Sequence, residues 1–304
     1  IKLKILLLGY SKLAKKRIIN FFIKKRIKFS VASISFKKKI KGSYAQYNSY
    51  DKALHNSKAD IVYISLPNSL HYYWAKKSLN LNYHVIVDKP ICKNIRQAKN
   101  LIKISKKNKK LITEATFFNY HEQITKLIKL SKQEKIRNIN SNFIIPYPKK
   151  GILISKKLDG GVLMDMGPYI SAIPRIFSIK NIKSKKIIIN KNKNGLIYCI
   201  KFLINFKKFN YSGIFKFGGD YINEIEVFLK NKSIKIERAF SPPEDENLFL
   251  LINKNNKLKK IRIIKDNCFS NYFCEVISKI NKKNFSFYHK RFLDDCYFRN
   301  KILK

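Results

Sequence analysis

Two short apolar runs separated by a helix-like segment form the clearest pattern in the chain. Ile61–Leu66 and His84–Val87 are almost wholly apolar and rich in β-branched residues, which is typical of strands that are buried on both faces. Between them, His71–Leu81 has the spacing of an amphipathic helix and follows a polar turn. The pattern predicts a strand–helix–strand unit in a parallel sheet.

Polar residues follow both runs at the point where each strand should end. Pro67 and Asn68 come after the first strand, and Asp88–Lys89–Pro90 comes after the second. Open parallel sheets bind their ligands beyond the carboxyl ends of their strands. We therefore expect the chemistry of the protein at this edge of the sheet.

The same alternation extends over residues 1–119, which we expect to form one dinucleotide-binding domain. Ile1–Leu8 predicts a first strand that runs into the turn Gly9–Ala14 and then a helix. The other elements expected in this domain are strands at Phe29–Ile34 and Leu111–Ala115 and helices at Asp51–Asn56 and Asn94–Asn108.

The turn Gly9–Ala14 stands where a dinucleotide fingerprint, G-x-G-x-x-G/A, is expected. Gly9 permits a tight turn and Ala14 permits close packing, but Ser11 replaces the glycine that lets the backbone approach a pyrophosphate. Backbone amides and the helix N-terminus would still face the phosphates. The cofactor contacts expected in this turn are Gly9, Tyr10, Ser11, Lys12 and Leu13.

The end of the second strand bears on the choice between NAD and NADP. Ser33 is followed by Lys37–Lys39, and no carboxylate is present. A carboxylate would repel the 2′-phosphate of NADP, whereas hydroxyls and cations accept it. Ser33 and Lys37 therefore favour NADP over NAD, while the alternative interpretation of the lysine run is a solvated surface.

Residues 120–304 are expected to form a second, α+β domain. Turns such as Asn194–Gly195 and Pro242–Pro243 separate short strand-like runs, which favours a mostly antiparallel, open-faced sheet. The expected strands are Ile136–Ile145, Lys185–Ile189, Leu196–Asn205, Asn210–Phe217, Ile222–Leu229, Ser233–Arg238, Leu248–Ile252 and Leu258–Ile264, with helices at Glu122–Leu130, Cys268–Ile280 and Arg291–Ile302.

The strong positive charge does not change this prediction. A total of 65 lysines and arginines against 19 acidic residues gives a formal net charge of +46, which would suit a nucleic-acid-binding protein. The lysines are spread along helices and strands alike, so we expect no specific nucleic-acid partner. The five cysteines lack metal-site spacing and predict reduced thiols in a cytoplasmic protein. No apolar run reaches the length of a membrane span.

Three motifs together resemble the Gfo/Idh/MocA oxidoreductase family. The likeness covers essentially the whole chain and is strongest between Ala59 and Phe177. It implies a Rossmann cofactor domain followed by an α+β domain with an open-faced sheet. In that family likeness, residues 120–304 would bind the substrate and mediate oligomerisation. The motifs are Pro67–Asn68–Ser69–Leu70–His71, Asp88–Lys89–Pro90, and the stretch Gly160–Gly161–Val162–Leu163–Met164–Asp165–Met166–Gly167–Pro168–Tyr169, which is similar to the family's Gly-Gly-x-Leu-x-Asp-x-Gly-x-His/Tyr signature.

The resemblance also implies roles for individual residues. Lys89 is the implied catalytic lysine, Tyr169 the proton relay to the substrate oxygen, and Asp165 a partner of the substrate or of Lys89. Each has a plainer alternative: a surface lysine, a buried aromatic residue and a structural carboxylate. Asp165 and Tyr169 are four residues apart and would share one helix face. The implied cofactor pocket adds Leu66, Pro67, Asn68, His71, Asp88, Lys89 and Glu114.

These features predict NAD(P)-dependent hydride transfer between nicotinamide and a hydroxyl or keto carbon of a sugar or nucleotide sugar. No metal site is expected. One alternative is a relative that keeps the cofactor and performs elimination or glycoside cleavage without net redox change. Another is a binding or regulatory protein without turnover. Because family members pair through the open sheet face, the resemblance implies a homodimer or homotetramer.

Overall fold

The computed structural model describes residues 3–34, 39–178 and 181–303, which fall into two compact units. The first unit comprises Ile1–Ala115 and Phe273–Asn300, and the second comprises Thr116–Tyr272 and Lys301–Lys304. The boundary expected near Asn119 therefore falls at Ala115, and Phe273–Asn300 belongs to the first unit instead of the second. The division of cofactor and substrate binding between the two units stays a prediction.

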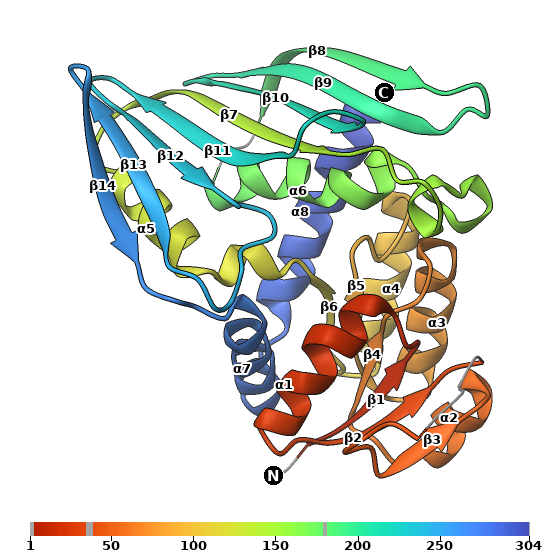
Figure 1. Ribbon diagram of the computed structural model, residues 1–304. Helices are drawn as coiled ribbons and strands as arrows, with labels where there is room; N and C mark the ends of the chain where they lie inside the picture. The colour runs from red at the N-terminus through yellow and green to blue at the C-terminus, as the bar shows by residue number, and fades with distance from the viewer. Residues whose placement is uncertain (1–2, 35–38, 179–180, 304) are drawn as a thin grey trace. The chain divides into compact units, whose positions relative to one another are not determined.

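A six-stranded parallel sheet forms the centre of the first unit (Figure 1). Its strand order is β3-β2-β1-β4-β5-β6, which is the doubly wound order of a dinucleotide-binding fold. The order reverses between β1 and β4, so the carboxyl ends of these two strands form the switch point where such sheets bind ligands. The strands are β1 (Lys4–Leu8), β2 (Lys28–Ala32), β3 (Ala45–Tyr47), β4 (Ile61–Ile64), β5 (His84–Asp88) and β6 (Ile112–Ala115).

The helices of the first unit come from both ends of the chain. Phe273 stacks on Phe21 with ring centroids 5.0 Å apart and lies 5.8 Å from the ring of Tyr63, so a C-terminal residue completes the core beside β4. Phe292 and Cys296 are buried in the same way. The helices are α1 (Ile19–Lys24), which continues a π-helical turn at Ala14–Ile18, α2 (Tyr50–Asn56), α3 (Asn68–Asn80), α4 (Ile95–Lys107), and most of α7 (Cys268–Asn281) and α8 (Ser286–Leu303).

The second unit contains an eight-stranded sheet in the order β14-β13-β12-β11-β7-β10-β9-β8 (Figure 1). Among the described strand pairs of this second sheet, only β7–β10 is parallel, so the expected mostly antiparallel sheet is confirmed. The strands are β7 (Ile136–Ile145), β8 (Ile182–Lys191), β9 (Ile197–Phe206), β10 (Asn210–Phe217), β11 (Ile222–Leu229), β12 (Ser233–Glu237), β13 (Leu248–Lys254) and β14 (Lys257–Ile263), and the helices are α5 (Glu122–Ser131) and α6 (Val162–Ile176).

One face of this second sheet is apolar and the other is polar. Along β10, Tyr211, Phe215 and Phe217 are buried on the face that packs against α6, while the residues between them are partly exposed. On the opposite face, Asn142 donates a 3.1 Å hydrogen bond to Glu224, which also pairs with Lys235 at 2.7 Å. Within the described residues, no helix has both the length and the apolar character needed to cross a bilayer.

Candidate active site

The turn after β1 requires glycine at position 9. Gly9 has φ +97°, and a Cβ atom there would lie 2.1 Å from the carbonyl oxygen of Ser65. Its amide donates to the carbonyl of Ala32 at 2.9 Å, which fixes the turn against the neighbouring strand. This turn, which we call the cradle, therefore lies too close to the end of β4 for any side chain at position 9, as the first glycine of a dinucleotide-binding turn does. The close approach of Gly9 to Ser65 is the observation by which this turn fits a dinucleotide cofactor.

Ser11 begins the helix that follows the cradle. Its hydroxyl accepts a 3.0 Å hydrogen bond from the amide of Ala14, and its carbonyl accepts one from Lys15 at 3.0 Å. This is the geometry of an N-cap serine, which satisfies an amide that the first helical turn leaves unpaired. Of the other expected contacts in this turn, Tyr10 lies under the Lys15 ammonium, Lys12 is exposed and Leu13 is half-buried.

A chain of hydroxyl groups joins the cradle to the ends of β4 and β5. The hydroxyls of Ser11 and Ser65 are 2.7 Å apart, and Ser65 donates to Asp88 at 2.7 Å. Tyr63 donates to the second oxygen of the same carboxylate. Asp88 thus belongs to the site, but its carboxylate accepts from buried residues of the sheet. Sequence reasoning missed Ser65 and Tyr63, because neither falls in a motif.

His71 ties two turns of the site together. Its ring is buried, with Nδ1 2.8 Å from the carbonyl oxygen of Pro90 and Nε2 2.7 Å from that of Leu66. Carbonyl oxygens only accept, so the neutral ring donates to one of them and the protonated ring to both. The structure therefore gives His71 a positioning role between the turns that follow β4 and β5. Pro67 and Asn68 lie half-buried where α3 begins.

Glu114 is the second buried residue that holds the Lys89 turn. It accepts the amide of Ile91 at 3.0 Å and pairs with Arg299 of α8 at 3.3 and 3.4 Å. Burial alone lowers the pKa of Arg299, but the adjacent Glu114 carboxylate outweighs it and the pKa is raised. Glu114 is thus bonded within the protein, and its expected contact with a cofactor stays a prediction. No sequence motif marks its partner Arg299, which lies 185 residues away.

Lys89 lies half-buried at the carboxyl end of β5, between Asp88 and a cis bond to Pro90. Its position at the ligand-binding edge agrees with the expected one. Ser33 is buried just beyond β2, where its amide donates to Tyr47 at 2.9 Å. Lys37, the other residue expected to meet a 2′-phosphate, lies outside the described residues.

Asp165 and Tyr169 both lie on α6, in the second unit, whereas Lys89 lies in the first. The half-buried ring of Tyr169 packs against Phe118, Phe143 and Phe240, with centroids 5.5, 5.6 and 5.0 Å away. These contacts fix the ring, so the aromatic-packing interpretation holds for the ring itself. A catalytic role for its hydroxyl stays a prediction.

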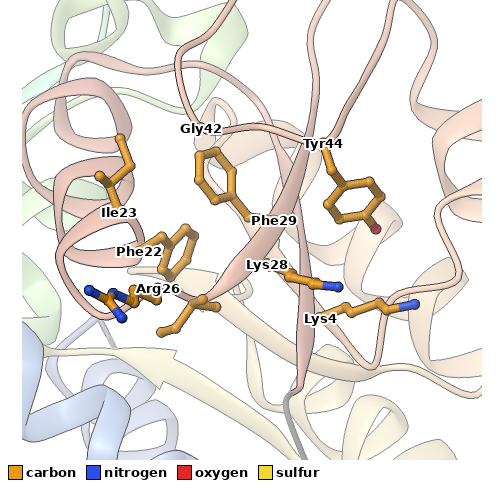
Figure 2. A pocket seen from close by; sticks show the side chains of 9 residues that line it. Lys4, Phe22, Ile23, Arg26, Lys28, Phe29, Gly42 and Tyr44 are labelled. Carbon is orange, nitrogen blue, oxygen red and sulfur yellow. The ribbon is translucent and has the colours of Figure 1, made fainter.

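The hollow drawn in Figure 2 lies in the first unit, at the edge of the sheet opposite to the carboxyl ends of the strands that carry Gly9 and Lys89. It has a volume of about 460 Å³, and Lys4 and Lys28 stand at its rim where β1 and β2 begin. Phe22, Phe29 and Tyr44 supply its aromatic lining (Figure 2). Dinucleotides bind beyond the carboxyl ends of such strands, so this hollow is not the cofactor site. Among the described residues, no group of His, Cys, Asp and Glu is arranged to hold a metal ion.

Comparison with known proteins agrees with the fold and with the motifs. Residues 3–116 match a family described as "Oxidoreductase family, NAD-binding Rossmann fold" and named GFO_IDH_MocA. The Rossmann region of the chain, residues 3–116, belongs to the Gfo/Idh/MocA oxidoreductase family. The expected Rossmann unit and the mostly antiparallel sheet unit are both confirmed.

Individual relatives are distant in sequence but close in fold. An uncharacterised oxidoreductase of Rhizobium meliloti is 23% identical over 235 residues, which cover 70% of this chain and 65% of that protein. A dTDP-3,4-didehydro-2,6-dideoxy-alpha-D-glucose 3-reductase of Streptomyces violaceoruber is 24% identical, covering 69% and 64%. The matches thus span just under two thirds of these relatives. The crystal structure of a 3-ketoreductase from Actinomadura kijaniata, in complex with NADP and TDP-benzene, gives a TM-score of 0.91 at 17% identity over 99% of this chain and 96% of that one.

Proposed function

We propose that the protein is an NAD(P)-dependent oxidoreductase that transfers hydride between nicotinamide and a hydroxyl or keto carbon of a nucleotide-linked sugar. The observation that carries this proposal is the pairing of the Gly9 cradle after β1 with Lys89 after β5, at the carboxyl edge of one doubly wound sheet. The sugar class is supported by the similarity to a dTDP-sugar 3-reductase and by the fold shared with a 3-ketoreductase bound to TDP-benzene.

The cofactor in this proposal is NADP rather than NAD. Ser33 stands beyond β2, where an NAD-binding domain commonly carries a carboxylate for the ribose hydroxyls. A hydroxyl accommodates a 2′-phosphate without charge repulsion. The A. kijaniata 3-ketoreductase, which shares the fold, was solved with NADP.

The chain's own residues would divide the chemistry as follows. A bound nicotinamide would supply or accept the hydride. The backbone amides of the Gly9 cradle and the helix N-terminus behind it would bind the pyrophosphate. The Lys89 ammonium would stabilise negative charge on the substrate oxygen, and Tyr169 would pass a proton to that oxygen. Asp165 would orient the substrate.

Titration of the purified protein with NADPH and NADH at physiological salt tests the cofactor assignment, since a net charge of +46 attracts any polyanion at low salt. Nicotinamide absorbance with a dTDP-linked keto sugar then tests the reaction, with Lys89→Ala as the control. Saturable binding that favours NADPH, together with net NADPH oxidation, supports the proposal. Absence of saturable binding refutes it. If the sugar is consumed without a net change in NADPH, the result favours elimination instead of net hydride transfer.

The assembly and location of the protein belong to the same proposal. We expect a homodimer or homotetramer that pairs through the polar face of the second sheet, around Asn142, Glu224 and Lys235. Analytical ultracentrifugation checks the assembly, and a monomer would contradict it. We also expect the protein in the cytoplasm, with its five cysteines reduced.

A further inference from the structure

The hydroxyl chain through Ser65 has a fixed direction. Carboxylate oxygens only accept, so the single hydroxyl hydrogen of Ser65 is donated to Asp88, at 2.7 Å. Ser65 therefore accepts from Ser11, whose oxygen lies 2.7 Å away. The chain runs from the amide of Ala14 through Ser11 and Ser65 to Asp88, with each hydroxyl donating once.

This direction explains how a serine can stand where the fingerprint has glycine. The Ser11 hydroxyl caps its own helix and donates to Ser65, so its hydrogen is turned away from any phosphate on the loop. The pyrophosphate would then meet backbone amides, as it does in a glycine loop. The serine adds a link that glycine lacks, because only a side chain can connect the loop to the next strand.

The middle of the chain is buried, which makes the link stiff. Ser65 is 3% exposed, and its carbonyl oxygen is the atom that Gly9 approaches too closely for a Cβ. A hydrogen bond to a carboxylate in such a place is stronger than one between neutral groups in water. At the far end, Asp88 is the residue immediately before Lys89. The two ends of the chain are thus the phosphate loop and the lysine-bearing turn.

We propose that Ser65 is a positioning residue that couples the phosphate loop to the Lys89 turn through the Ser11–Ser65–Asp88 chain, so that cofactor affinity and lysine placement depend on one buried hydroxyl. The proposal rests on the oxidoreductase function proposed above. Ser65 touches neither reactant; it acts through Ser11 on the cofactor and through Asp88 on the lysine.

Removal of the middle hydroxyl should weaken both ends. In Ser65→Ala we expect the Kd for NADPH to rise about tenfold and kcat at saturating NADPH to fall about tenfold, which is the effect of losing one hydrogen bond at each end. Ser65→Cys, which keeps the shape with a weaker donor, should lie between Ser65→Ala and the wild type. The matched control is Ser30→Ala, because Ser30 is a wholly buried serine of β2 whose hydroxyl has no hydrogen-bond partner among the described residues.

A three-residue cycle separates coupling from simple loss of structure. In the wild-type background, the effects of Ser11→Ala and Asp88→Asn on the NADPH Kd should be non-additive, because both variants break the same chain. In the Ser65→Ala background the two effects should add. Additivity in both backgrounds, or a Ser65→Ala Kd equal to that of Ser30→Ala, would overturn the proposal.

Amide hydrogen exchange of the free protein distinguishes this proposal from the function on which it rests. In Ser65→Ala, amide exchange should accelerate both in residues 9–14 and in residues 88–91. In Ser30→Ala, exchange should accelerate in neither segment. If the wild type binds neither nucleotide, the oxidoreductase proposal fails while joint acceleration still supports the coupling. If NADPH binds and only one segment responds to Ser65→Ala, the function stands and the coupling fails.

Discussion

Replacement of Gly9 by alanine offers the most direct test of the cradle. The new Cβ would lie 2.1 Å from the Ser65 carbonyl oxygen and 2.8 Å from its carbon, whereas real Cβ contacts stay beyond 3.0 Å, so one backbone must move by about 0.9 Å. Two costs add: strain at φ +97°, about 1–3 kcal/mol, and overpacking against backbone, about another 1–3 kcal/mol. We expect the free energy of unfolding of Gly9→Ala to fall by about 2–6 kcal/mol.

Gly42→Ala provides the matched control in the same unit. Gly42 also has a positive φ, +82°, but its Cβ would meet side chains instead of backbone: Ile23 at 3.0 and 3.3 Å, which can move aside, and Phe29 at an ordinary 3.5 Å. The free energy of unfolding of Gly42→Ala should therefore fall only by the cost of backbone strain, about 1–3 kcal/mol. The chain has one tryptophan, Trp74 on α3 of the first unit, so its fluorescence in a urea titration reports unfolding for both variants.

Cofactor binding provides the second readout of the same experiment. A loop displaced by nearly 1 Å should bind NADPH about 100-fold more weakly, while Gly42→Ala should bind as the wild type does. Equal stability losses in the two variants would show that the close approach to Ser65 is not rigid. Normal NADPH binding by a folded Gly9→Ala protein would remove the cradle from the cofactor site.

Three further outcomes follow from the site and its surroundings. Lys89→Ala should lower kcat by about 10²–10⁴-fold with little change in the NADPH Kd, which steady-state kinetics and fluorescence titration separate; a parallel loss of binding would argue for a structural lysine. Arg299→Ala should lower the free energy of unfolding by about 3–5 kcal/mol in urea, because it leaves the Glu114 carboxylate buried without its cation, and Arg299→Met combined with Glu114→Gln should lose less. Burial, and then the charge of Lys110, lowers the pKa of His84 to about 4 from an ordinary value of 6.5, so the unfolded state binds more protons between those values and stability should rise with pH across that window. Allowing for solvent screening, His84 should raise the free energy of unfolding by on the order of 1–2 kcal/mol as the pH rises from 4 to 6.5. In urea titrations, His84→Asn should show a smaller rise over the same range.

Much of the fold can be predicted from the sequence because burial imposes a period on the chain. Buried runs such as Ile61–Leu66 predict the parallel strands, and alternation along Asn210–Phe217 predicts a strand with one covered face. The edge strand β3 could not be predicted in this way. Its three residues, Ala45–Tyr47, are only half-buried and pair with β2 alone, so no periodic pattern marks them.

The return of the chain to the first unit could not be predicted either. Phe273 and Phe292 belong to apolar patterns that predict helices, but such a pattern does not tell on which unit the helix packs. What assigns Phe273 is its packing against Phe21 and Tyr63, which lie more than 200 residues earlier. Phe292 is assigned by its burial in a core cluster of the first unit. The Arg299–Glu114 pair is hidden for the same reason, since neither residue type is expected in a core without its partner.

Burial divides the residues of the candidate site into two kinds, and this division changes how the sequence motifs are interpreted. Ser65, His71 and Glu114 are almost wholly buried, and each uses its polar atoms to hold a turn. Lys89 is only half-buried and lies at the edge where a ligand would bind. A residue of the first kind is needed for the position of the turns, so its loss should change stability and cofactor affinity together. A residue of the second kind can change affinity or turnover alone. Sequence motifs mix the two kinds, because the folded turn and the bound ligand constrain the same short stretch of chain.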